Sequence, residues 1–284
     1  MESNFPRILF LIIARDHYPN NLDEETQRQT WATKCNYFDV VWLKGNSDSI
    51  FFNANNRELR LPIKEAQENI LYKTVKGIEF SLANFDFDIL VRTNVSTYFK
   101  PKVIVKKINF LLDNKLMAAG YLEKTSQDYR NIPSGTIFIT GTGIFLNKKA
   151  AELLTDMDCS LYSGIPDDVA ISEFLAKSKV KIRNIGRCNT HLTGLYFPNG
   201  YARFKSSVDS ERASIRMDSI YQIEQSRYRI TKIRLILKFI HGELNFFKSN
   251  MLHRRAVIRS LLPLLILNIK KVVKRIALRR NYEI

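Results

Sequence analysis

The hydrophobic residues of this chain gather in short runs that alternate with amphipathic segments. Strands buried on both faces of a parallel sheet read as near-continuous apolar runs. On this basis the pattern predicts strands at Arg7–Ala14, Asp39–Leu43, Asp88–Val91, Met117–Tyr121 and Thr136–Leu146, the last interrupted by glycines 141 and 143.

Between these runs, apolar residues recur at helical spacing. Asp23 is expected to cap the first of the helices, and proline precedes or opens two others, a position where its missing N–H costs nothing. The predicted helices are Asp23–Ala32, Ile63–Leu82, a helix from Pro101, Lys148–Leu154 and Asp168–Lys177. Alternation of strands and helices predicts an α/β fold with a mostly parallel sheet flanked by helices.

The pattern becomes wholly helical from about Ser214. Ile230–Phe247 and Met251–Leu278 both interleave apolar and basic residues, and Pro263 breaks the second segment. We therefore expect a main α/β domain over residues 1–226 and a basic, amphipathic helical tail over residues 227–284.

Charge separates the tail from the body. The whole chain carries a formal net charge of +16. The tail alone holds 15 Lys and Arg residues against two acidic residues, Glu243 and Glu283. A cationic, leucine-rich helix suits the surface of an anionic membrane. The alternative is that these helices pack on the main domain and leave their basic faces in solvent.

The apolar runs are too short to span a bilayer. Arg7–Ala14 and Leu261–Leu267 both fall well below the roughly 20 residues that a spanning helix needs. No signal peptide is recognisable, and three widely spaced cysteines suggest reduced thiols. We expect a cytoplasmic protein, peripheral on the inner face of a membrane.

Polar residues follow the strand at Asp88–Val91. Ligands in open α/β sheets bind beyond the carboxyl ends of the strands, so Arg92–Ser96 marks an expected site. A metal-dependent sugar-nucleotide transferase would place acids there, whereas this chain has Asn94 and Ser96. Asp86 and Asp88 begin the strand and therefore lie at the opposite edge.

Two further segments carry candidate chemistry. Asp167 and Asp168 follow Pro166 and open a helix, where a carboxylate either satisfies free amides or accepts a proton from a substrate. Farther along, Arg203 and Lys205 could offset the charge of a diphosphate. Arg92 could share that role, or pair with an acid in the core.

Taken in order, several fragments resemble the β-1,3-galactosyltransferase/Fringe-type glycosyltransferases. The family has an R-x-T-W-type start, an N-L-T-x-K-T helix, a K-x-D-D-D strand end, a G-T-G turn and an E/D-D-V acid motif. Five segments of this chain line up with these motifs in the same order. The segments are Arg28–Ala32, Asn69–Thr74, Arg92–Ser96, Gly141–Leu146 and Gly164–Val169.

The resemblance implies a GT-A (Rossmann-like) fold, a UDP-sugar donor, a glycan or glycolipid acceptor and inversion at the anomeric carbon. It places the catalytic base on Asp168, with Asp167 as the second candidate. The donor would contact a set of polar residues and glycines: Arg92, Asn94, Ser96, Gly141, Gly143, Arg203 and Lys205.

The departure from the family lies at its metal motif. Asn94 and Ser96 offer only neutral oxygens, and His191 stands where the family often has a metal-binding histidine. A hard cation such as Mn²⁺ binds weakly to neutral ligands alone. The sequence leaves open a weak metal site, a metal-free transferase, or a catalytically inactive module that binds sugar nucleotides or glycans.

A nucleic-acid-binding protein is a third functional class that the basic tail suggests. The chain lacks a recognisable nucleic-acid-reading motif. Its tail interleaves leucine and isoleucine with the basic residues, where single-strand binders present aromatic stacking platforms. We therefore expect no nucleic acid among the partners.

Overall fold

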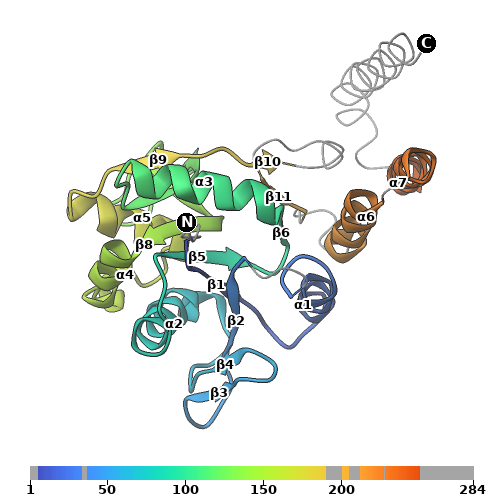
Figure 1. The fold of residues 1–284 in the computed structure, drawn as a ribbon. Coiled ribbons are helices and arrows are strands. Elements are labelled where there is room, and N and C mark those ends of the chain that lie inside the picture. Colours follow the sequence, from blue (N-terminus) through green and yellow to red (C-terminus); the bar gives the residue numbers. More distant parts are fainter. Residues whose placement is uncertain (1–5, 34–36, 190–199, 205–211, 227, 250–284) are drawn as a thin grey trace, which may run out of the picture.

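A central eight-stranded sheet organises the molecule (Figure 1). The structure, a computed structural model, describes residues 6–33, 37–189, 200–204, 212–226 and 228–249. Within them the strand order is β3-β4-β2-β1-β5-β8-β7-β9. These strands are β1 (Ile8–Ile13), β2 (Asp39–Lys44), β3 (Phe51–Asn53), β4 (Glu58–Arg60), β5 (Ile89–Asn94), β7 (Ala118–Lys124), β8 (Ile137–Asn147) and β9 (Ile182–Asn184).

Most neighbouring strands in this sheet are parallel. β4, β2, β1 and β5 run in one direction, and β7 pairs in parallel with β9. β8 is antiparallel to both of its neighbours, and β3 is antiparallel to β4. The α/β class with a mostly parallel sheet flanked by helices is thus confirmed.

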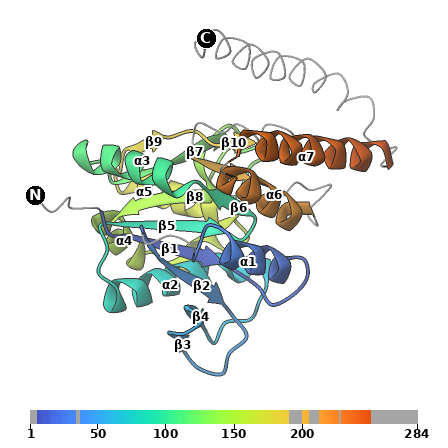
Figure 2. The same cartoon turned by 45° about the vertical axis from the view of Figure 1, so that its right-hand side comes forward.

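Helices cover both faces of the sheet (Figures 1 and 2). The alternating side chains of β1 divide the core: Phe10 packs toward α3 and α6, and Leu11 packs toward α2, α4 and α5. The helices are α1 (Asn20–Gln29), α2 (Ile70–Asn84), α3 (Pro101–Asp113), α4 (Lys148–Thr155), α5 (Asp167–Lys177), α6 (Ala213–Gln225) and α7 (Arg229–Ser249), with short 3₁₀ turns at Gln67–Asn69 and Cys159–Tyr162.

A second, three-stranded sheet lies beside the end of β5. It has the order β10-β11-β6, formed by Cys188–Asn189, Tyr201–Arg203 and Thr97–Phe99. The ring of Phe99 stacks on that of Tyr201 with a centroid distance of 5.3 Å. This sheet carries Arg203 to the edge where β5 ends, because Arg203 pairs with Thr97.

Several predicted boundaries were wrong. Helix α1 begins at Asn20 after Pro19, so Asp23 does not cap it but is buried in its first turn. Helix α2 begins at Ile70, because residues 63–66 are irregular and residues 67–69 form a 3₁₀ turn. Strand β5 continues through Asn94, so Arg92 lies inside the strand.

The glycine segment of β8 forms a bulge rather than a break. Between the pairs Gly120–Ile144 and Leu122–Ile139, one residue of β7 lies opposite four residues of β8, 140–143. The extra residues of β8 include Gly141 and Gly143, which leave the regular ladder beside the carboxyl end of β5. Bulges of this kind redirect backbone groups and are common next to functional sites.

Helix α7 packs on α6 through a buried ion pair. The Glu243 carboxylate accepts from Arg216 at 2.7 Å and from Arg212 at 2.8 Å. Arg216 and Glu243 are each only 1% exposed, so their charges depend on one another. In sequence these two arginines follow Arg203 and Lys205 and are further candidates for offsetting a diphosphate, but the structure pairs both with Glu243.

No helix in the described part of the chain is both long enough and apolar enough to cross a lipid bilayer. The predicted helix at Met251–Leu278 lies outside the described residues.

Candidate active site

Arg92 is the central side chain at the carboxyl end of β5. It is 2% exposed. Its guanidinium donates to the Asn94 side-chain oxygen at 2.9 Å, to the Gly141 carbonyl, and to the Asp167 carboxylate. Arg92 therefore joins β5, the β8 bulge and the first turn of α5, which are remote from one another in sequence.

Gly141 is required at this junction because its neighbours approach the backbone closely. A Cβ atom on Gly141 would lie 2.5 Å from Nη1 of Arg92 and 3.4 Å from Oδ2 of Asp168. Its carbonyl accepts from Arg92, and its amide donates to the Asp168 carboxylate at 2.9 Å. The Gly141 backbone thus binds Arg92 through its carbonyl and Asp168 through its amide, and it holds both side chains beside the bulge.

Asp168 is a buried carboxyl group with a raised pKa. It accepts hydrogen bonds from the Gly141 and Val169 amides, at 2.9 and 3.0 Å. Burial, and next the charge of Asp167, raise the pKa of Asp168 to about 6, although the backbone donors and Arg92 act in the opposite direction. A base with a pKa close to the working pH is well matched to proton transfer.

Asp167 has a different environment from its neighbour. It forms the ion pair with Arg92, and no side chain caps the helix that begins here after Pro166. Helix capping therefore does not account for both acids. Asp167 neutralises Arg92, and Asp168 places its carboxylate beside the β8 bulge.

The polar residues at the end of β5 are tied into the protein. The Asn94 side-chain oxygen faces the Arg92 guanidinium, and its backbone carbonyl accepts from Gln27 at 3.2 Å. Ser96 is 4% exposed and lies in the turn between β5 and β6, where its carbonyl accepts from Phe204. The site thus brings Arg92, Asn94, Gly141, Asp167 and Asp168 together.

These residues do not fit a divalent cation. A metal at the Asn94 oxygen would lie against a fixed guanidinium, which repels it. Among the described residues, no group of three His, Cys, Asp or Glu side chains could hold a metal ion. His191 and Lys205 lie outside the residues that the structure describes.

Gly143 and Arg203 lie at the boundary between the two sheets. A Cβ on Gly143 would lie 3.0 Å from the ring of Tyr201, so this glycine admits the aromatic packing that joins the sheets. Arg203, on β11, is exposed next to the end of β5. Of the predicted donor-binding residues that the structure describes, Arg203 is the one with an exposed cationic side chain.

Sequence reasoning missed Arg187, which supports the bulge from its other side. It donates to the hydroxyls of Thr140 and Thr142 at 3.1 and 2.8 Å, and to Glu123 at 2.8 Å. Its guanidinium also lies 4.3 Å from the ring centroid of Tyr121. A lone arginine before a short strand carries no signal that would have revealed this role.

Lys73 also proves to be a buried pairing residue at this edge of the sheet. Its ammonium donates to the Ala14 carbonyl at 3.1 Å and to Glu65 at 2.7 and 2.9 Å. Burial lowers the pKa of Lys73, with Glu65 acting against that shift. Asp86 and Asp88 lie at the opposite edge of the sheet, just before β5, as the sequence predicts. Both pair with Arg7.

The chain matches no protein-family model, and no curated protein matches its sequence. Among solved structures, it is similar to a glycosyltransferase involved in glycosylation of the major capsid of PBCV-1, with 13% identity over 74% of this chain and 98% of that one, and a TM-score of 0.49. A mannosyltransferase from Pyrobaculum calidifontis, solved with GDP-Man and Mn²⁺, shares 11% identity over 93% and 81%, with a TM-score of 0.46. A putative glucose-1-phosphate thymidylyltransferase from Bacillus anthracis, solved with a sucrose, shares 12% over 74% and 95%, with a TM-score of 0.43. Similarities of this size assign no activity to the chain.

Proposed function

We propose that this protein is an inverting glycosyltransferase that transfers a hexose, galactose or N-acetylglucosamine, from a UDP-sugar to a hydroxyl of a glycan or glycolipid. The observation that carries the proposal is Asp168. It is a carboxyl group with a pKa of about 6 at the end of the central strand, held by the Gly141 amide and flanked by the Arg92–Asp167 pair.

In this reaction the acceptor oxygen attacks the anomeric carbon as the bond to the UDP oxygen breaks. The electron pair of that bond leaves with UDP, and the acceptor proton passes to Asp168. A positioned general base contributes roughly 10²–10⁴-fold to such a step. The Asp168 carboxyl group suits this task, because a pKa of about 6 leaves it mostly ionised at neutral pH.

Arg92 is assigned a positioning role. Its guanidinium is already directed at Asn94, Gly141 and Asp167, and its side chain is buried. We assign to Arg203 the role of offsetting the negative charge on the leaving diphosphate. Lys205, which lies outside the described residues, is assigned the same role. A fixed cation at a developing negative charge is a large catalytic contribution. No step is assigned to a metal.

For the tail, residues 227–284, we propose contact with an anionic membrane surface that carries the acceptor. Its excess of basic residues and its apolar stripes support this contact. The ion pair of Glu243 with Arg216 holds the first tail helix on the main domain, which leaves the segment after Ser249 as the proposed membrane-binding part.

Release of UDP from UDP-galactose and UDP-N-acetylglucosamine, measured with and without sugar acceptors, tests the proposal. We expect acceptor-dependent release with one of the two donors. Binding of UDP without turnover under all conditions would favour the rival function, a sugar-nucleotide-binding module without catalysis.

A further inference from the structure

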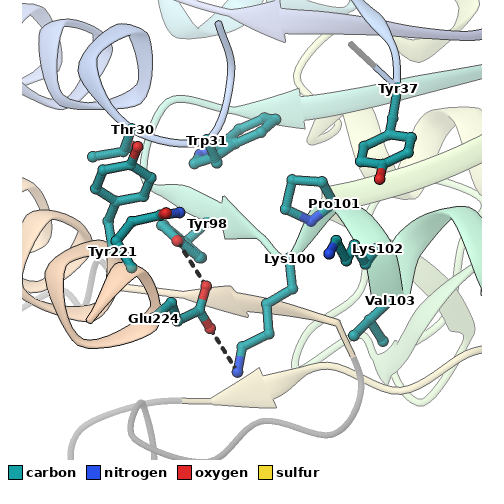
Figure 3. A pocket seen from close by; sticks show the side chains of 11 residues that line it. Thr30, Trp31, Tyr37, Tyr98, Lys100, Pro101, Lys102, Val103, Tyr221 and Glu224 are labelled. Atoms are coloured by element: carbon teal, nitrogen blue, oxygen red, sulfur yellow. Dashed lines mark hydrogen bonds and ion pairs between the residues drawn. The ribbon is translucent and has the colours of Figure 1, made fainter. Parts of the chain in front are cut away.

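A cavity lies on the other face of the sheet from Asp168. It has a volume of about 450 Å³ and opens between the end of α1, β6, the start of α3 and the end of α6 (Figure 3). Trp31 and Tyr98 on its wall belong to the core cluster on the α3 and α6 side, whereas α5 belongs to the cluster on the opposite side. The cavity is therefore separate from Asp168, the proposed base.

Four aromatic side chains contribute to the wall of this cavity: Tyr37 and Tyr221 are partly exposed, whereas Trp31 and Tyr98 are each 1% exposed and pack in the core. Trp31, Tyr37, Tyr98 and Tyr221 come from separate parts of the chain and surround the same space (Figure 3). An aromatic face carries negative charge density, so it attracts the weakly positive C–H groups on the face of a sugar ring. Tyrosine and threonine hydroxyls on the wall can both donate and accept hydrogen bonds.

A fixed pair of charges lies at one side of the cavity. Glu224 accepts from the Tyr98 hydroxyl at 3.0 Å and pairs with the Lys100 ammonium at 2.7 Å. Oε2 of Glu224, which accepts from Tyr98, has a further lone pair that can accept from a ligand hydroxyl. Because Lys100 neutralises it, the pair presents hydrogen-bonding groups without a net charge.

The polar groups on the wall disfavour a purely apolar ligand, which would leave them without water or partner. Lys102 also lines the cavity, so two lysines and one glutamate contribute charge to its wall. The volume is within the range of small-molecule sites, about 300–1,000 Å³. A ring with an apolar face and several hydroxyls fits the tyrosine rings and the Glu224–Lys100 pair together.

We propose that this cavity binds one neutral hexose or deoxyhexose unit of a glycan. The site would hold a glycan at a distance from the reacting hydroxyl, or retain the product chain. The inference does not depend on the proposed transferase activity, because sugar can bind here without donor or turnover.

Saturation-transfer NMR on the full chain tests this inference. The probes are D-galactose, D-glucose, D-mannose, N-acetyl-D-glucosamine and L-fucose, each titrated in the millimolar range without donor. We expect at least one sugar to bind. Tyr221→Ala and Glu224→Gln should each weaken it roughly tenfold or more, because aromatic and charged anchors dominate such sites.

Two matched variants separate a binding role from a folding role. Tyr221→Phe keeps the ring and should change affinity less than threefold, and Gln222→Ala alters an exposed neighbour on the same helix and should change nothing. Melting curves of each variant verify the fold. If Tyr221→Ala fails to fold, Glu224→Gln still tests the site, because it keeps the side-chain volume.

Three results would overturn the proposal: no saturation transfer to any of the five sugars, binding that persists at full strength in both Tyr221→Ala and Glu224→Gln, or displacement of the bound sugar by millimolar inorganic phosphate. The last result would identify an anion site. A sugar signal lost in Asp168→Asn but retained in Tyr221→Ala would place the binding at the reaction site.

Discussion

The guanidinium of Arg92 is paired with Asp167 and not with Asp168. The buried cation is therefore neutralised by the first of two adjacent acids, and the second acid keeps a raised pKa because it is buried beside a like charge. Two carboxyl groups of the same chemistry acquire different roles from their surroundings.

The first prediction concerns pH. Burial raises the pKa of Asp168 to about 6, and the base must be deprotonated to accept a proton. We therefore expect kcat/KM to fall about tenfold per pH unit below pH 6 and to level off above it, since this parameter reports the free enzyme. A profile that stays flat down to pH 4.5 would remove Asp168 from the role.

The second prediction concerns Arg92. Arg92→Ala leaves the Asp167 carboxylate partly buried without its partner and frees the Gly141 carbonyl. Breaking a buried pair costs about 3–5 kcal/mol of unfolding free energy, measurable by urea denaturation. Arg57→Ala removes an exposed pair with Asp39 and should cost no more than about 1 kcal/mol. Equal losses in the two variants would mean that the Arg92 pair is no more important than a surface contact.

The third prediction concerns metal. Because Asn94 and Ser96 stand where acids are expected and Asn94 faces Arg92, we predict that EDTA leaves at least part of the transfer activity. Arg203→Ala should lower kcat more than EDTA does, and Arg183→Ala, an exposed arginine on the edge strand β9, should not. Complete loss in EDTA, restored by Mn²⁺, would show a metal held by other ligands.

The fourth prediction concerns the tail. A chain that ends at Ser226 lacks Glu243 and leaves the buried Arg216 without its carboxylate, so we expect it to melt earlier or to aggregate. A chain that ends at Ser249 keeps this pair, so it should fold and lose cosedimentation with phosphatidylserine vesicles. If the chain that ends at Ser226 is as stable as the full protein, the packing of α7 contributes nothing to stability. If the longer one still binds vesicles fully, the segment after Ser249 is not the membrane contact.

The main elements of the fold follow from the sequence because its strands are buried on both faces. β1 is buried at all six positions and reads as an unbroken apolar run. By contrast, β3 and β4 are only three residues each, and neither contains an apolar run longer than two residues. β4 pairs in parallel with β2, and β3 pairs antiparallel with β4. No local pattern distinguishes such short strands from turns.

The position of the site was predictable, and its contacts were not. The polar end of β5 and the Asp167–Asp168 pair are visible in the sequence, since both interrupt apolar runs. The partner of Arg92 lies 75 residues away, and the choice between the two acids depends on how α5 packs against the β8 bulge. Arg187 and Glu243 likewise acquire their roles only through tertiary contacts.

The most direct test of the account is Asp168→Asn. Its control is Glu173→Gln, at a partly exposed residue of the same helix that pairs with Lys177. An amide fills the same space but cannot accept the acceptor's proton. We predict a kcat for transfer lower by roughly 10²–10⁴-fold, with UDP affinity by calorimetry within about threefold of wild type and the control unchanged. Near wild-type turnover by Asp168→Asn would contradict the assignment of the base, and with it the central claim.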